Sequence, residues 1–204
     1  HNDAFGGTSN DRIYRRTLDY IQNYKGDYDE LLIIPAWTTY ERREVAYSNT
    51  VDHTDGYTSW QQQDVNYVSL LLNTKPTVNT GDVLQDVAIS DWHRNATILN
   101  NSQHNAQNFY NQQYSLKHIC KSLGIHLIQT YALDNNEFVK GDAEGNEKWI
   151  ADIDAVTPSM NRMLYYHPQP KTVRCPLKHP NELGHKYIAE TLHPSIENYL
   201  NTRG

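Results

Sequence analysis

The sequence predicts an α/β fold built on a mostly parallel sheet. Two short apolar runs, Leu31 to Ala36 and Ile125 to Tyr131, have the pattern of buried strands and alternate with segments of helical periodicity. Strands separated by helices favour parallel pairing through right-handed crossovers. In sheets of this kind the functional groups gather at the carboxyl ends of the strands.

The first helix is expected from Ser9 to Tyr24. Ser9 or Asn10 is the expected N-cap, and Asp11 lies in the first turn, where the helix dipole favours a carboxylate. Gly26 closes the segment. One face of this helix carries Ile13, Thr17, Ile21 and Tyr24, with Leu18 beside them.

The middle of the chain is less regular. Residues 37–62 are polar and aromatic without a clear period, and we interpret them as a long loop, which in a compact domain is usually functional or bound to a partner. A helix is predicted over 64–72, a breaker region over 75–82 and a long helix over about 95–123, ending at Gly124. Residues 134–148 are rich in turn formers and are expected to be exposed.

The last predicted element is a helix over 181–192. Pro194 is expected to stop or kink it, because proline removes a backbone donor, and a last turn should then run to Leu200.

Composition favours one globular domain over residues 1–204. The chain is long enough to bury a sizeable core, and no run approaches the roughly 20 apolar residues of a membrane span. The net charge of −6 argues against a nucleic-acid or anionic-membrane partner. The fifteen tyrosines against three phenylalanines reflect either codon bias or a surface that packs against other chains.

Cysteine and histidine usage predicts neither a disulfide framework nor a metal site. Cys120 and Cys175 are too few for a disulfide scaffold, so we expect reduced core residues and either a reducing cytoplasm or a phage particle as the location. The histidines outside the C-terminal motif show no metal-ligand spacing, and no cofactor motif is present.

Two motifs adjoin predicted helices. The segment FGGTSNDRI at 5–13 places a glycine pair before a capped helix, where bare backbone N–H groups stabilise an anion; a simple tight turn is the alternative. The segment HPNELGH at 179–185 leads into an apolar helix. Pro180 suits the first helical position and holds His179 extended, as a general base requires; capping of the helix by His179 is the alternative.

Together these motifs resemble the SGNH/GDSL hydrolase family, especially divergent members encoded by tailed bacteriophages. HPNELGHKYIAETL at 179–192 is similar to the family's histidine block, AFGGTSNDRIYRRT at 4–17 is similar to its second block, and LLIIPAWTTYERRE at 31–44 occupies the place of its third. The resemblance implies a three-layer α/β/α sandwich, flavodoxin-like in architecture. Residues 1–204 would form one domain without the family's first strand and helix, in keeping with a chain that opens on His1 rather than methionine.

The resemblance also implies an activity: ester hydrolysis by an esterase, lipase or carbohydrate deacetylase. His179 would act as general base for a serine upstream of residue 1, and Gly7 and Thr38 would hold the oxyanion. An ester-bearing small molecule or glycan is the implied substrate. The candidates for the substrate pocket are Trp37, Arg42, His185 and Asn10. Two alternatives stay open, core packing for the tryptophan and a surface ion pair of Arg42 or Arg43 with Glu41 or Glu44.

Three departures from the family pattern support a second hypothesis. The serine block is absent from residues 1–204, Pro176 stands where the family has an aspartate, and Thr38 replaces the oxyanion-hole asparagine. Ser9 is better explained as a helix cap than as a nucleophile, and Asp152 and Asp154 are the conceivable substitutes for the missing acid. The second hypothesis is an inactive structural or binding protein of the same fold, such as a virion or tail component with homo-oligomer contacts.

Overall fold

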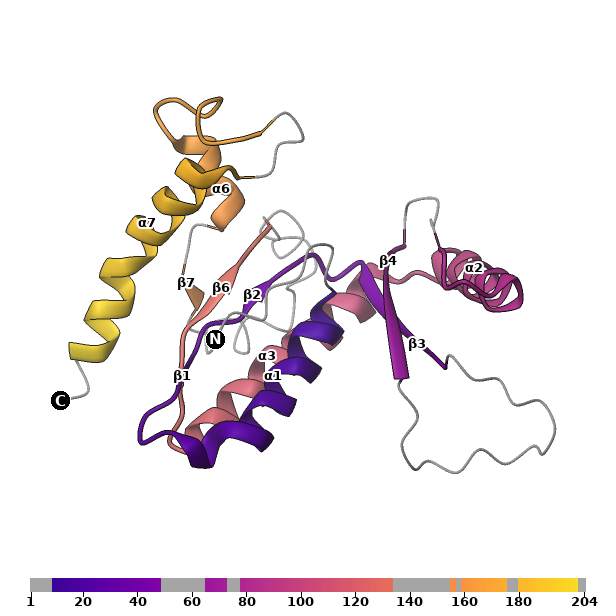
Figure 1. The fold of residues 1–204 in the computed structure, drawn as a ribbon, viewed down its shortest axis with the longest axis horizontal. Coiled ribbons are helices and arrows are strands. Elements are labelled where there is room, and N and C mark those ends of the chain that lie inside the picture. Colours follow the sequence, from indigo (N-terminus) through magenta and orange to yellow (C-terminus); the bar gives the residue numbers. More distant parts are fainter. Residues whose placement is uncertain are drawn as a thin grey trace.

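The fold was analysed in a computed structural model that describes residues 9–48, 65–72, 78–133, 155–156, 159–175 and 180–201. Its helices are α1 (Asn10–Tyr24), the short 3₁₀ helix η1 (Lys25–Asp27), α2 (Val83–Ile98), α3 (Ser102–Ser122), α6 (Met160–Tyr166) and α7 (Glu182–Asn201). Its strands are β1 (Leu32–Ile33), β2 (Ala36–Trp37), β3 (Arg42–Ser48), β4 (Val65–Leu71), β5 (His126–Leu127), β6 (Gln129–Tyr131) and β7 (Ala155–Val156). Figure 1 shows their arrangement.

The predicted parallel pairing is confirmed. β1 pairs with β5, and β6 lies between β2 and β7, all in parallel. The backbone carbonyls of residues 31, 33, 35 and 37 accept from the amides of residues 126, 128, 130 and 132. Since alternate residues bond without a break, the two predicted apolar runs form one continuous ladder. The chain is therefore a mixed α/β protein with small parallel sheets.

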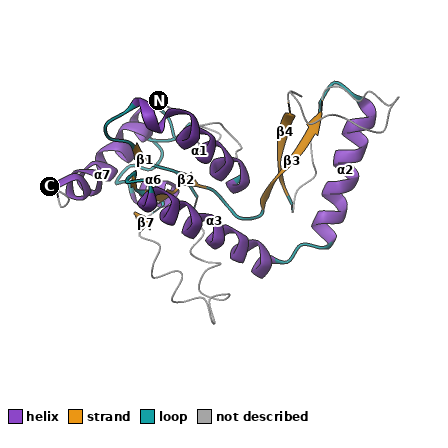
Figure 2. Cartoon of the chain, turned by 90° about the horizontal axis from the view of Figure 1, so that it is seen from below, coloured by secondary structure: helices purple, strands orange, loops and turns teal. Residues whose placement is uncertain are grey.

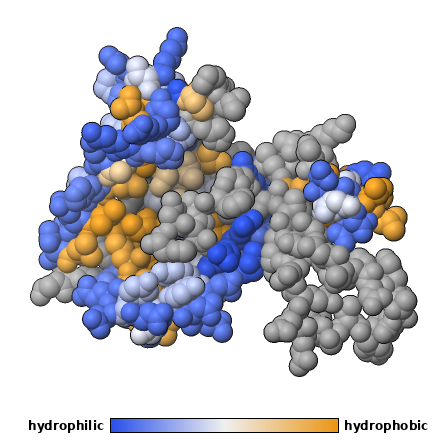
Figure 3. All heavy atoms as spheres, viewed as in Figure 1, coloured by the Kyte–Doolittle hydropathy of each residue, from blue (hydrophilic) through white to orange (hydrophobic). Residues whose placement is uncertain are grey.

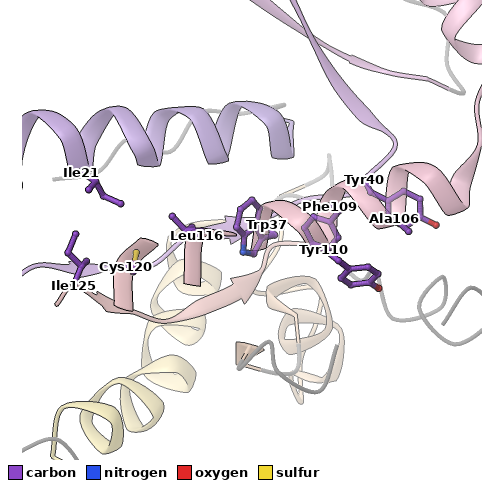
Figure 4. Close-up of a cluster of buried hydrophobic side chains, with 9 residues drawn as sticks. All are labelled: Ile21, Trp37, Tyr40, Ala106, Phe109, Tyr110, Leu116, Cys120 and Ile125. Carbon is purple, nitrogen blue, oxygen red and sulfur yellow. The ribbon is translucent and has the colours of Figure 1, made fainter. Parts of the chain in front are cut away.

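Helices α1 and α3 pack together beside these strands. Ser9 caps α1 by accepting from the backbone N–H of Arg12, and Asn101 caps α3 by accepting from that of His104. Figure 4 shows the buried cluster that α1, β2, α3 and the start of β5 share. Its members are Ile21, Trp37, Tyr40, Ala106, Phe109, Tyr110, Leu116, Cys120 and Ile125.

A second apolar cluster joins α6 to α7. Its buried members are Met163, Leu164, Val173, Ile188 and Leu192. The two helices lie together at the end of the chain in Figure 1. Each cluster is centred on its own elements, so the described chain has two cores.

A third part of the chain extends away from both clusters. β3 and β4 form an antiparallel ribbon from Arg42 opposite Leu71 to Ser48 opposite Val65, and α2 lies beside it (Figures 1 and 2). Thr97 of α2 donates its hydroxyl to the backbone oxygen of Leu72 at 3.1 Å. Gly81 adopts a φ of 87° just before the helix, and Asp82 caps it.

Several predictions for this middle region were wrong. The predicted loop over 37–62 contains β3, and the predicted helix over 64–72 is β4. The seven-residue ladder between them satisfies backbone groups that neither segment can satisfy alone, and short apolar runs do not distinguish helix from strand by periodicity.

The helix boundaries also needed correction. The long helix predicted over 95–123 is two helices, because the amide of Leu99 closes α2 on Asn95 while Asn101 begins α3. At the C-terminus α7 continues through Pro194 to Asn201, so that proline does not stop the helix. α6 and β7 were not predicted. The segment 134–148 lies outside the described residues.

Candidate functional site

The carboxyl end of β2 is fastened to the amino end of α1 by a pair of hydrogen bonds. The Asn10 amide donates from Nδ2 to the backbone oxygen of Thr38 at 3.0 Å. In return the backbone N–H of Thr38 donates to Asn10 Oδ1 at 2.8 Å. Both residues are buried, and so is the cap residue Ser9. This junction lies at the edge of a parallel sheet where functional groups gather.

The hydrogen bonds at this junction restrict what Thr38 and Asn10 offer a ligand. The expected oxyanion donor was the Thr38 hydroxyl, in place of the family's asparagine amide; the backbone N–H of Thr38 serves Asn10, and the residue is only 5% exposed. Asn10, expected near a substrate pocket, is a tether between a helix and a strand. Sequence reasoning missed this role, although a side chain that both donates and accepts is the type needed to hold one backbone N–H and one C=O.

Trp37 is a core residue. Its side chain is fully buried, and its indole Nε1 donates to Gln129 Oε1 at 2.9 Å across to β6. Its ring meets Phe109 edge-on, with centroids 5.7 Å apart. Core packing, the alternative left open by the sequence, accounts for these contacts.

A polar network binds β3 to α1 and α3. The Asp11 carboxylate accepts from the backbone N–H of Glu44 at 3.2 Å and from Gln112 Nε2 at 2.9 Å. Arg43 approaches the same carboxylate at 3.3 Å and donates to Asn105 Oδ1 at 3.2 Å. Asp11 therefore joins three elements.

The ion pairs of this network differ from those expected. Glu44 pairs with Arg15, which donates from Nε and Nη2 to its two carboxylate oxygens, each at 3.1 Å. Such a fork-like pair fixes orientation as well as charge. Arg43 pairs with Asp11 rather than with Glu41 or Glu44. Arg42 is half-buried at the start of β3, opposite Leu71.

The Pro-Asn-x-x-Gly part of the C-terminal motif is explained by packing. Asn181 caps α7 by accepting from the Gly184 backbone N–H at 3.0 Å, and its Nδ2 donates to the Thr172 backbone oxygen at 2.8 Å. A Cβ on Gly184 would collide with the backbone oxygen of Val173 and lie 3.0 Å from the Pro180 Cβ. Glycine is therefore the residue that this close approach requires.

Hydrogen bonds connect the start of α7 to the sheet. The backbone N–H of Ala132, just after β6, donates to the Trp37 oxygen at 2.7 Å, and the Ala132 oxygen accepts from the Asn161 N–H at 3.1 Å. Arg174 donates to Asn161 twice, at 2.9 and 3.0 Å, and forms a β-bridge with Pro180. The motif's proline is thus linked, through Arg174 and Asn161, to the residue that follows β6.

The remaining site candidates are placed as follows. His185 is exposed on α7. His179, Gly7, Pro176, Asp152 and Asp154 lie outside the described residues. Within the described ranges, no three His, Cys, Asp or Glu side chains gather as metal ligands would, and no helix is long and apolar enough to cross a membrane.

Two groups in or packed against the α1–α3 cluster have a raised pKa. Burial raises the pKa of the Tyr131 phenol, while the hydrogen bond from Gln113 Nε2, 3.3 Å away, lowers it in part. Burial also raises the pKa of the Cys120 thiol, to about 11. A neutral thiol of that kind is not a nucleophile at neutral pH.

Comparison of the chain with protein-family models, with curated proteins and with solved structures found no match.

Proposed function

We propose that this chain forms most of an SGNH-type ester hydrolase with a three-layer α/β/α architecture. The observation that supports the proposal is that described residues of both motifs are linked to the carboxyl ends of β2 and β6, which form one edge of a parallel sheet. The helix that follows the first motif is bonded to Thr38 after β2, and the histidine motif is linked through Arg174 and Asn161 to Ala132 after β6. Active sites of open parallel sheets form at this edge.

The proposed nucleophile is a serine on a strand that precedes residue 1. Such a strand has a place to pair, because the outer edge of the run 31–37 is not paired with any described strand. The backbone groups that point to this open edge belong to Leu32, Ile34 and Ala36, and each of these residues has a backbone N–H to donate. Ile34 is 41% exposed. An open edge of this kind accepts a further strand.

The proposed chemistry is acyl transfer. The serine Oγ attacks the ester carbonyl while His179 takes its proton, and the Gly7 backbone N–H donates to the oxyanion. His179 then returns the proton to the leaving alcohol, and water hydrolyses the acyl-enzyme by the same route. Thr38 contributes at most its hydroxyl, since its N–H is held by Asn10. The proposed substrates are acetylated glycans or lipid esters.

The test uses the gene product together with the residues that precede His1. We expect hydrolysis of p-nitrophenyl acetate, labelling of one serine by a fluorophosphonate, and a loss of at least about 10³ in kcat for His179→Ala. His193→Ala is the matched control, because that histidine is exposed on α7 beside Glu197. Activity that survives His179→Ala, or labelling of a serine within residues 1–204, would overturn the mechanism.

A second candidate, an inactive structural or binding protein of the same fold, is favoured by the Asn10–Thr38 junction. The Asn10 amide and the backbone groups of Thr38 are buried and satisfy each other, so these groups are not presented to a substrate oxygen. Absence of both fluorophosphonate labelling and His179-dependent turnover, with the chain recovered in a stoichiometric particle, would select this candidate.

A further inference from the structure

The outward face of α2 is more apolar than the face it buries. Ile89 and His93 are buried. The large apolar side chains that are 55–79% exposed are Val83, Leu84, Val87, Ile98 and Leu99. A helix whose contacts were all within its own chain would show the opposite distribution. Exposed apolar side chains gathered on one face of a helix mark an interaction site.

The positions on this face follow the spacing of a helix-pairing seam. Leu84, Val87, Asp91, Arg94 and Ile98 are separated by three, four, three and four residues. This is the alternation that keeps one stripe of a helix against a partner helix. At its centre Arg94 lies 3.1 Å from Asp91, and the two side chains are 70% and 57% exposed.

We propose that this face docks onto α2 of a second copy of the chain, with the two helices antiparallel. A two-fold axis midway between positions 91 and 94 sets Val87 opposite Ile98 and Asp91 opposite Arg94, and symmetry repeats each layer. The order of acid and base along the helix therefore makes the face complementary to itself. Parallel pairing would instead set each charge against its like.

Other features of the molecule agree with a second copy as the occupant. α2 lies at one side of the molecule in Figures 1 and 2, far from α1 and α7. Figure 3 shows apolar side chains at this outer margin, where a partner can reach them without contacting α1 or α7. A membrane surface fits less well, because a charge pair interrupts the face and the net charge is −6.

The expected complex is a weak dimer. One helix pair is at the small end of specific interfaces, and exposed ion pairs add little, so half-association is expected on the order of 10 µM. Sedimentation of the 204-residue chain should show a concentration-dependent rise towards twice its mass of 23.6 kDa. Val87→Glu and Ile98→Glu should each hold it monomeric. Leu183→Glu, at an exposed leucine of α7, should leave the dimer unchanged.

Charge exchange tests whether Asp91 and Arg94 lie in the interface and does not depend on the apolar variants. Asp91→Arg alone and Arg94→Asp alone should both be monomeric, because each places like charges opposite each other. Mixed in equal amounts they should form a heterodimer, since each arginine then meets an aspartate. Circular dichroism checks that every variant is folded. A wild-type chain that stays monomeric at ~100 µM, a dimer insensitive to Val87→Glu, or a mixture that does not associate would each overturn the proposal.

Discussion

Single buried polar side chains hold the sheet to its helices. Asn10 serves both backbone groups of Thr38, and Gln129 takes the indole N–H of Trp37. Buried polar groups without a partner lose their hydration and gain nothing in return. Each of these side chains therefore contributes to the stability of the fold more by hydrogen-bonding to a buried partner than by being buried itself.

Removing the Asn10 amide is expected to destabilise the protein strongly. Asn10→Ala deletes two hydrogen bonds and leaves the Thr38 N–H and C=O buried without that partner, which should lower the free energy of unfolding by about 2–4 kcal/mol. Urea denaturation followed by circular dichroism measures the change. Asn111→Ala, at an exposed position of α3, should shift it by less than about 0.5 kcal/mol. Equal effects of the two substitutions would contradict the assigned role of Asn10.

The two cysteines should differ in reactivity. Both are free thiols; Cys120 is buried with a pKa of about 11, whereas Cys175 is half-buried. At pH 8 only about a thousandth of Cys120 is then thiolate, so iodoacetamide should modify Cys175 first and Cys120 only in denaturant. Peptide mass spectrometry identifies the modified site. Rapid native labelling of Cys120 would show that its site opens readily.

The same thiol gives a pH dependence. The pKa of the Cys120 thiol in the folded state lies above its ordinary value of 9.0. As pH rises the thiol therefore ionises first in the unfolded state, which favours unfolding. The contribution of this thiol to stability is complete below pH 9 and is lost between pH 9 and 11. Cys120→Ser should flatten the stability profile in that window.

At the scale of elements, most of the HPNELGH motif at the start of α7 serves packing. Pro180, Asn181 and Gly184 bridge, cap and fit closely against the segment before the helix, and none of these contacts requires catalysis. The motif therefore supports the fold in either proposed function, and only His179 distinguishes them.

The close approach at Gly184 makes its replacement costly. Gly184→Ala should reduce stability by roughly 1–3 kcal/mol, because the new Cβ meets the backbone oxygen of Val173, which cannot move aside as a flexible side chain does. Gly26→Ala is the matched control: nothing lies within 4 Å of its added Cβ, so it should be neutral or slightly stabilising. Thermal unfolding of both variants measures the difference. A tolerated Gly184→Ala would mean that α7 lies farther from Val173.

For the whole molecule, the two apolar clusters predict that two regions of the chain unfold with different free energies. Leu116 lies in the cluster of α1 and α3, and Leu164 in the cluster of α6 and α7. Leu164→Ala should accelerate amide exchange mainly over 160–201, whereas Leu116→Ala should accelerate it mainly over 10–24 and 102–131. Hydrogen exchange with mass spectrometry resolves the two regions. Uniform acceleration by either substitution would show that the clusters unfold as one unit.

Features whose causes lie within a few residues can be predicted from the amino-acid sequence of this protein. Ser9 as a cap, the helix over 10–24 and the two apolar runs were predictable because capping chemistry and apolar periodicity act locally. The parallel pairing of the two runs was predictable from the alternation of strands with helices along the chain. Tertiary structure decided the rest. The β3–β4 ribbon exists because two distant segments satisfy each other's backbone, and Asn10 acquires its role only when Thr38, 28 residues away, is folded against it. Pairing energies between distant segments leave no pattern in either segment alone, and for that reason only the folded chain shows how the edge of the sheet is assembled.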